Sequence, residues 1–473
     1  MSYNNKNAVI YLGPFLGFLL GVFSFANGFD LLAAVTIWVT IWTATWWVFE
    51  AVPIPVASLV PLAILPLFGV LTSKQVAQAY GHKLVLLLLG GFLLSKAMEK
   101  SGAHRRIALK MVALCGGGGG KTLVLGFMIA SAGLSMWISN TATTLMMLPV
   151  VIAVLEKAKD RKIKVPLLLG IAFAANVGGI GTPIGTPPNM VMMGYYENIK
   201  GVEISFLDWM KVGAPVTLAM VIVIWVWLTR NIRSKSLIPL PDPGSWRTEE
   251  KRTLLVFFIT AFAWVTRSDP FGGWKNLFNL VSKSDLGLHN ILSGANDASV
   301  AFLAVIVLFC IPSGNKNGEK LLDWETASKI PWGLLILVGS GICLGTAISE
   351  SGLSKSIGEL LVGIDSFSLP VLIISIALLV TFMTEMTSNT ATTNILMPIL
   401  GAASTASGIN LEILLFPAAI SASCAFMLPV ATMPNAVVYG TGEFSIKRMV
   451  SEGFMLNLIG AIVITLVCSM VLS

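Results

Sequence analysis

The chain has 473 residues, of which 55% are hydrophobic and only 12% are charged, and its mean hydropathy is +0.82. Soluble domains carry about 25% charged residues, so a water-soluble fold of this size is excluded. The net charge of +7 does not indicate a nucleic-acid partner, because the basic residues cluster between apolar segments. Charge-free stretches of about 20 residues recur, as membrane-spanning helices require. We therefore predict an all-α polytopic membrane protein embedded in the lipid bilayer.

Charge-free intervals set the expected spans in chain order. The first follows a single lysine and is interpreted as a retained span, because a cleaved signal peptide usually has a shorter apolar region. The segment from Lys96 to Ala113 mixes cations with apolar residues and predicts an amphipathic helix on the membrane surface. We expect about eleven crossings, over residues 7–29, 31–49, 51–73, 80–99, 165–196, 212–229, 253–266, 298–315, 330–349, 413–438 and 452–473.

Two further apolar regions do not fit single spans. The first runs from Thr122 to Leu155 and has 34 uncharged residues, which one helix would stretch to about 51 Å. Its middle is polar, and so is the middle of the second region, Ser366 to Leu411. A re-entrant hairpin with a polar tip explains both regions, because non-helical backbone persists at membrane depth only where protein or a cavity surrounds it.

The basic clusters predict how the chain is oriented. The first hairpin lies between clusters around Lys157–Lys164 and Lys96–Lys121, which the positive-inside rule places in the cytoplasm. Five spans separate the two hairpins, so the second hairpin opens outward. We expect a multi-pass protein of the plasma or inner membrane, with its N-terminus in the cytoplasm and its C-terminus outside.

The two hairpin tips are copies of one motif. Residues 139–149 read SNTATTLMMLP and residues 388–398 read SNTATTNILMP, with 7 identities in 11 positions at an offset of 249. Downstream, the TPPN of residues 186–189 matches the TMPN of residues 432–435 at an offset of 246. Because an odd number of spans separates the copies, the two halves form an inverted-topology repeat, as secondary transporters do.

Each copy also contains a predicted break in a helix. The glycines and prolines from Gly178 to Pro188 cannot stay helical, since proline removes a hydrogen-bond donor and clashes with the preceding turn. Leu428 to Pro434 breaks the second copy in the same way. Paired discontinuous helices in corresponding halves are typical of a transporter's binding site at the centre of the membrane.

The chemistry of such a site follows from its residue types. If the two tips meet the two breaks, they present hydroxyls, carboxamides, backbone amides and carbonyls with almost no formal charge. The helix that restarts after each tip presents free N–H groups, which bind a carboxylate without a permanent cation. Hydroxyl and carbonyl oxygens suit a small hard cation such as Na⁺. Two equivalent tips suit an anion with two charged ends, such as a dicarboxylate.

Three other interpretations fit the sequence less well. Small polar residues often serve only to pack helices in the membrane, but two identical tips beside two matched breaks make that interpretation the weaker one. A membrane-embedded enzyme would need histidines, cysteines or paired acids near the centre, and the sequence offers no such cluster. A channel would need no exchange of bound states. We expect a protein that is not an enzyme and has no cofactor.

The paired Ser-Asn-Thr motifs with Gly-Thr-Pro-Pro-Asn resemble the divalent anion/sodium symporter (DASS) family of di- and tricarboxylate transporters, and the resemblance covers nearly the whole chain. It implies a homodimer in which each protomer moves a transport domain across the membrane as an elevator. The implied scaffold comprises residues 1–120 (spans 1–4 and the amphipathic helix) and 236–365 (spans 7–9). The implied transport domain comprises residues 121–235 and 366–473, each with one hairpin, one broken span and one further span.

The resemblance also implies site residues. The substrate would contact both tips and the restarts of both broken helices, through Ser139, Asn140, Thr141, Ser388, Asn389, Thr390, Thr186, Thr432, Met433 and Pro434. If Na⁺ is the coupling ion, the first cation site would combine Ser135, Ser139, Asn140 and Gly185, and the second Thr384, Thr387, Asn389 and Ala431. Spacing supports part of this set, because Ser135 and Thr384 each lie one helical turn before the tip serine.

Two positions leave the function open. Met433 stands where the first copy has Pro187 and where the family usually has proline, so substrate choice and ion coupling are not fixed. Glu385 lies deep in the second hairpin, where it serves either proton or cation coupling or as a structural carboxylate. The predicted function is Na⁺-coupled symport or exchange of succinate, malate, fumarate or 2-oxoglutarate. The alternative is a proton-coupled anion transporter or ion antiporter of the same architecture.

Overall fold

The computed structural model describes residues 3–114, 120–158, 160–232, 244–268, 272–274, 292, 294–315, 318–360 and 367–472. Within these ranges the regular structure is helical, apart from one isolated antiparallel bridge between Pro312 and Lys320. The expected domain boundaries at 235/236 and 365/366 lie outside the described residues. Buried apolar side chains from nearly all the helices form one continuous core.

The N-terminal part contains the first spans and the amphipathic helix. Its helices are α1 (Tyr3–Ala26), α2 (Leu31–Phe49), α3 (Ile54–Ala57), α4 (Val60–Leu67), α5 (Ser73–Tyr80), α6 (Lys83–Ser101) and α7 (Ala103–Leu114). The expected third span is therefore two short helices, α3 and α4. The expected amphipathic helix begins later than predicted, because the chain turns at Gly102 with a φ of +73° between α6 and α7.

The α1–α2 pair illustrates how polar backbone is satisfied in an apolar helix. Pro14 has no N–H, so it leaves the Ile10 carbonyl without its partner within the helix. The Trp46 Nε1–H of α2 donates to that carbonyl at 3.2 Å. Gly17 allows the close approach, because a Cβ there would lie 2.6 Å from the Trp38 carbonyl oxygen.

The first hairpin and the first broken helix follow as predicted. They comprise α8 (Gly120–Ser135), α9 (Asn140–Lys157), the 3-10 turn η1 (Arg161–Ile163), α10 (Lys164–Gly178), the 3-10 turn η2 (Gly179–Gly181) and α11 (Pro187–Lys200). The hairpin turns at residues 136–139, and the helix breaks over residues 182–186. Both interruptions lie where the sequence predicts them.

The central segment connects the two repeats. It contains α12 (Phe206–Thr229), α13 (Thr248–Val265), α15 (Asp297–Cys310), α16 (Trp324–Ala327), α17 (Trp332–Glu350) and α18 (Leu353–Leu360). Helix α13 begins five residues before the predicted span, because its first turn carries Glu249, Glu250, Lys251 and Arg252. Charge-free intervals alone therefore underestimate its length.

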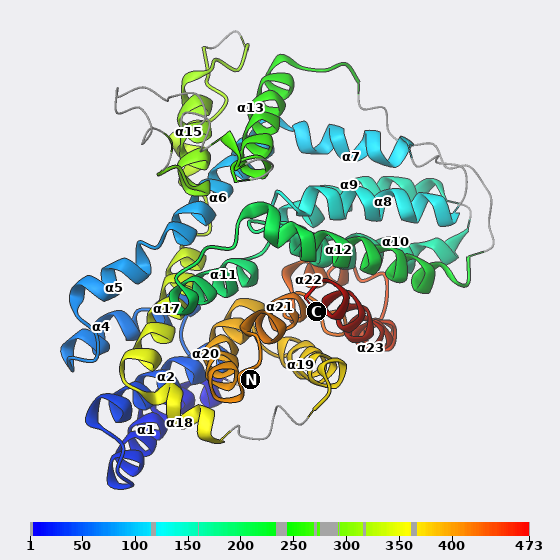
Figure 1. Cartoon of the computed structure of the whole chain (residues 1–473). Helices are drawn as coiled ribbons and strands as arrows, with labels where there is room; N and C mark the ends of the chain where they lie inside the picture. Colours follow the sequence, from blue (N-terminus) through cyan, green and yellow to red (C-terminus); the bar gives the residue numbers. More distant parts are fainter. Residues whose placement is uncertain are drawn as a thin grey trace, which may run out of the picture.

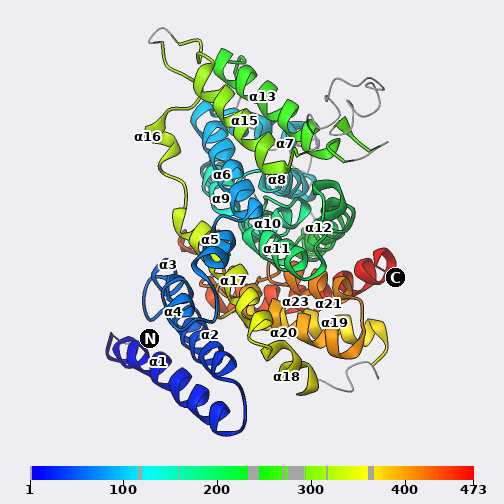
Figure 2. The ribbon, with the colours of Figure 1, turned by 60° about the vertical axis from the view of Figure 1, so that its left-hand side comes forward.

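The second repeat reproduces the first in order and form. The second hairpin is α19 (Leu369–Thr384) and α20 (Asn389–Ser407), the second broken helix is α21 (Leu411–Ser421) and α22 (Met433–Tyr439), and α23 (Ile446–Val471) ends the fold. Figures 1 and 2 place the α1–α2 pair at one end of the molecule and the α13–α15 pair at the other. The hairpins and broken helices of both repeats lie between these ends, next to one another.

Seven helical segments of the described chain are long and apolar enough to cross a membrane, namely Ala8–Ala26, Leu31–Phe49, Ser73–Ser101, Lys164–Gly181, Phe206–Thr229, Trp332–Glu350 and Ile446–Val471. Five shorter apolar helices accompany them. Two of these, α8 and α19, have 16 residues each and are the entry arms of the hairpins. The fold is a multi-pass helical membrane protein, and the number of eleven crossings stays a prediction.

Candidate functional site

Both hairpin tips and both helix breaks line one cavity of about 910 Å³. From the tips it receives Ser139, Asn140, Thr141, Ser388, Asn389 and Thr390. The two broken helices contribute Asn176, Gly185, Thr186, Pro187, Ala431, Thr432, Met433 and Pro434 to its lining. All ten predicted substrate-binding residues therefore lie around one space, although the chain separates the two tips by 249 residues.

Each tip serine begins the returning arm of its hairpin. Ser139 is the N-cap of α9, and its Oγ accepts a hydrogen bond from the Ala142 N–H at 3.2 Å. Ser388 is the N-cap of α20, without such a side-chain bond. The first turns of α9 and α20 thus open onto the cavity with their N-termini, where the helix dipole is positive. This geometry suits two carboxylate groups, one at each tip.

The two candidate cation sites have the same oxygen geometry. The Ser135 Oγ lies 2.5 Å from the Asn140 Oδ1 and 2.7 Å from the Ala175 carbonyl oxygen. In the second repeat, the Thr384 Oγ1 lies 2.7 Å from the Asn389 Oδ1 and 3.0 Å from a backbone carbonyl oxygen, that of residue 422. Each site thus brings together three oxygens, namely one hydroxyl, one side-chain amide oxygen and one backbone carbonyl. With the amides in these orientations, the only proton among the three is that of the hydroxyl. The lone pairs that accept no proton favour a cation.

The other predicted cation ligands lie around these two trios. A Cβ on Gly179 would lie 2.8 Å from the Asn140 Oδ1 and 3.1 Å from the Gly185 carbonyl oxygen, so these two oxygens flank Gly179. In the second site, the Thr387 Oγ1 donates to the Met383 carbonyl at 3.0 Å and also contacts the Thr392 Oγ1. Ser139 and Ala431 line the cavity. The backbone carbonyls of residues 175 and 422 are further candidate ligands, which the sequence did not indicate.

An asparagine holds each helix break open. The Asn189 Nδ2 donates to the carbonyls of Gly179 (2.9 Å) and Thr182 (2.8 Å). The Asn435 Nδ2 does the same for the carbonyls of residues 425 (3.0 Å) and 428 (3.1 Å). These carbonyls lie where the helices are interrupted, and those of residues 182 and 428 accept turn hydrogen bonds from the backbone N–H three positions on, at 3.3 and 3.2 Å. The asparagines supply further donors to this buried backbone. The shared asparagine of the two TPPN-like motifs is therefore structural.

Asn176 joins the two broken helices and was missed by sequence reasoning. Its Nδ2 contacts the Thr432 Oγ1 at 3.1 Å and the Asn435 Oδ1 at 3.2 Å, both in the other repeat. Its Oδ1 is buried and has no hydrogen-bond partner among the described residues. No copy of Asn176 exists in the second repeat, so the repeat pattern could not indicate it.

Glu385 accepts hydrogen bonds at the second break. Its Oε1 accepts from the Phe426 N–H (2.7 Å), the Met427 N–H (2.9 Å) and the Asn457 Nδ2 (2.8 Å), and its Oε2 accepts from the Leu428 N–H (3.0 Å). Four donors around one buried carboxyl fit a carboxylate that caps unwound backbone. These contacts favour the structural interpretation of Glu385 over a proton relay.

A helical membrane protein with two copies of hairpin and broken helix around one cavity belongs architecturally to the secondary transporters. The family model described as citrate transporter (CitMHS) matches residues 44–416. The chain therefore belongs to this transporter family, and the resemblance to DASS transporters is confirmed. The family consists of transporters rather than enzymes, as expected from the sequence.

Two relatives illustrate the similarity. A sodium-dependent dicarboxylate transporter SdcS of Staphylococcus saprophyticus subsp. saprophyticus is 38% identical over 490 residues, covering 98% of this chain and 91% of its own length. The protein of the same name from Staphylococcus aureus (strain USA300) is 38% identical, covering 97% and 89%.

Two solved structures share the fold. The Alcanivorax borkumensis YdaH transporter has a TM-score of 0.59 and 14% identity, over 85% of this chain and 88% of that chain. Neisseria gonorrhoeae MtrF has a TM-score of 0.60 and 14% identity, over 85% and 83%. At this identity the similarity shows the fold alone.

Proposed function

We propose that this chain transports four-carbon dicarboxylates, such as succinate, malate and fumarate, and also 2-oxoglutarate, across the plasma membrane with Na⁺ as the coupling ion. The observation that carries the proposal is the meeting of two identical Ser-Asn-Thr tips at one cavity. The names of the two staphylococcal relatives, sodium-dependent dicarboxylate transporters, agree with this assignment.

In this proposal each tip receives one end of the substrate. The N-terminus of α9 binds one carboxylate through Asn140 and Thr141, and the N-terminus of α20 binds the other through Asn389 and Thr390. One Na⁺ at each oxygen trio fixes the tip asparagine from behind. The cations thus lend positive charge to a site built from neutral groups, so that the anion binds well only when Na⁺ is present.

We further propose alternating access by an elevator movement in a homodimer, with the scaffold and transport domain divided at residues 120/121, 235/236 and 365/366. The N-terminus is placed in the cytoplasm and the C-terminus outside. The charged part of the cavity lining comprises Lys96, Glu99 and His104 near the end of α6, and Lys329. We take it as the cavity mouth, because the side chain of Lys329 is 63% exposed. Since that end of α6 faces the cytoplasm in this orientation, the structure corresponds to an inward-open state.

The test is uptake of labelled succinate into proteoliposomes, with and without an inward Na⁺ gradient and with and without internal dicarboxylate. We expect uptake that requires the Na⁺ gradient and no internal substrate. Uptake that needs internal dicarboxylate but ignores Na⁺ would establish exchange. Uptake driven by a pH gradient alone would favour the proton-coupled alternative.

The tip asparagines supply the matching mutations. Asn140→Ala and Asn389→Ala should each lower succinate uptake by about tenfold to a hundredfold, as expected when a buried contact to a charged group is lost. Asn410→Ala is the control, because Asn410 caps α21 at an exposed position away from the cavity. Wild-type uptake in both tip variants would remove these residues from the site.

A further inference from the structure

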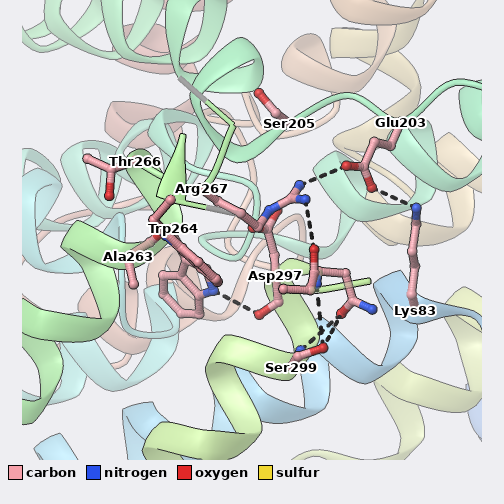
Figure 3. Close-up of polar contacts among 12 residues, drawn as sticks. Lys83, Glu203, Ser205, Ala263, Trp264, Thr266, Arg267, Asp297 and Ser299 are labelled. Carbon is pink, nitrogen blue, oxygen red and sulfur yellow. Dashed lines mark hydrogen bonds and ion pairs between the residues drawn. The ribbon is translucent and has the colours of Figure 1, made fainter. Parts of the chain in front are cut away.

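A cluster of charged residues lies at the start of α6, the end opposite the cavity mouth. It comprises Lys83 on α6, Glu197 on α11, Glu203 in the turn before α12, Arg267 after α13 and Asp297 at the start of α15. Figure 3 shows four of these side chains, those of Lys83, Glu203, Arg267 and Asp297, pointing toward one another from different segments of the chain. The 13 residues from Lys83 to Lys96 separate the cluster from the cavity mouth by about 20 Å along α6.

Two cations hold the cluster together. The Lys83 Nζ lies 2.7 Å from the Glu197 Oε1 and 2.7 Å from the Glu203 Oε2. The Arg267 guanidinium lies 2.9 Å from the Glu203 Oε1 and 2.6 Å from the Asp297 Oδ1. Burial of Glu203 would raise its pKa, but the hydrogen bonds and charges of Lys83 and Arg267 outweigh burial and lower that pKa. Glu203 is therefore ionised at neutral pH.

The cluster connects the two proposed domains through ion pairs. With the proposed domain division, Lys83, Arg267 and Asp297 belong to the scaffold, and Glu197 and Glu203 belong to the transport domain. Among the described residues, the ion pairs within 4.0 Å that cross this division all include Glu197 or Glu203. The others stay within one domain, as between Lys164 and Glu443 of the transport domain.

Separation of the domains would affect the two cations differently. Arg267, whose side chain is 3% exposed, would keep Asp297 of its own domain as a partner. Lys83 and Glu203 are already 32% and 31% exposed, so water can solvate them once they part. Glu197 would also lose Lys83, and its side chain is 20% exposed. The charges that lose a partner are therefore those that water can reach, which makes the contact reversible.

We propose that these residues form an ionic latch, which holds the transport domain against the scaffold in the inward-open state and breaks when the domain moves outward. The inference rests on the proposed transport function and its elevator movement. A displacement of more than a few ångströms would separate Glu197 and Glu203 from Lys83 and Arg267, because ion pairs weaken rapidly beyond contact distance in water. The latch would thus stabilise the inward-open state relative to the outward-open state.

Cross-linking tests whether the contact breaks during transport. Lys83→Cys/Glu203→Cys is treated with a bis-methanethiosulfonate reagent about as long as the two side chains that it replaces. We expect succinate uptake to stop and to return when a reductant cleaves the link, while each single cysteine variant keeps its uptake. Unchanged uptake by the fully cross-linked protein would show that these elements stay together and would overturn the latch.

A second measurement does not depend on transport. Leu145→Cys lies in the cavity wall, where Leu145 is 54% exposed, and is labelled by a thiol reagent from the cytoplasmic side. Adding Glu203→Gln should slow the labelling by about threefold to tenfold, as expected when a partly exposed charge pair is lost. Glu443→Gln is the control, since it removes the ion pair with Lys164, which is similarly exposed, lies within the transport domain and is away from the cavity. Equal labelling rates in the two variants would contradict the latch, whether or not succinate is the substrate.

Discussion

At the scale of single residues, the hydrogen-bond partners of Glu385 lie far from it in the sequence. The three backbone donors to its carboxylate lie 41 to 43 positions along the chain, and the Asn457 side chain lies 72 positions away. No spacing within the motif could indicate these partners. A protonated carboxyl group would place its own O–H donor among four donors, so the contacts favour the ionised form.

Glu385→Gln should therefore destabilise the protein. The amide places an NH₂ group among donors and leaves at least one buried N–H unpaired, which lowers the free energy of unfolding by about 1.5–3 kcal/mol. Thermal unfolding in detergent measures the change. Glu412→Gln is the control, because Glu412 accepts a hydrogen bond from the Tyr196 hydroxyl at 2.7 Å, which an amide oxygen can also accept. An unchanged melting temperature with a shifted pH profile of uptake would instead support a proton relay at Glu385.

At the scale of elements, the sequence predicted the hairpins and the breaks because their causes are local. Charge-free length, polar tips and paired prolines are readable along the chain, and the structure places the interruptions at residues 136–139 and 182–186. The contact of Asn176 with the other repeat was not predictable in this way, since it depends on how the two broken helices pack. The backbone carbonyls of the two candidate cation sites could not be predicted for the same reason.

The first break depends on two glycines in contact. A Cβ on Gly185 would lie 2.4 Å from the Gly179 carbonyl oxygen and 2.8 Å from its Cα, so backbone would have to move. Gly185→Ala should lower Na⁺-dependent succinate uptake by about tenfold or more, as expected when a packed contact is overfilled. Gly133→Ala is the control, because its Cβ would meet only the flexible end of Met111, at 3.1 Å. Equal uptake in the two variants would argue against a tightly packed first cation site.

At the scale of the whole molecule, the sequence predicted the repeat and the membrane class, and it described the boundaries of individual spans less well. The expected third span is two short helices, and the span before residue 266 begins in a charged turn that a charge-free interval cannot include. The ion cluster between α6, α11, α13 and α15 could not be predicted either. Its residues are ordinary charges near span ends until folding brings them together.

The orientation of the first repeat in the membrane can be measured directly. A cysteine in place of Lys162, before α10, should react with a membrane-impermeant thiol reagent only from the cytoplasmic side. A cysteine in place of Val202, after α11, should react only from outside, because one broken span separates the two positions. Val202 is 61% exposed, so access does not limit the reaction. Labelling of both positions from one side would refute the proposed topology.

The central claim is that two equivalent tips hold the two ends of one dianion. A structure determined by electron cryo-microscopy with Na⁺ and succinate tests it most directly. We expect density for one carboxylate at the N-terminus of α9 beside Asn140 and for the other at the N-terminus of α20 beside Asn389, with a cation behind each asparagine. Succinate bound elsewhere, or held by one tip alone, would contradict it.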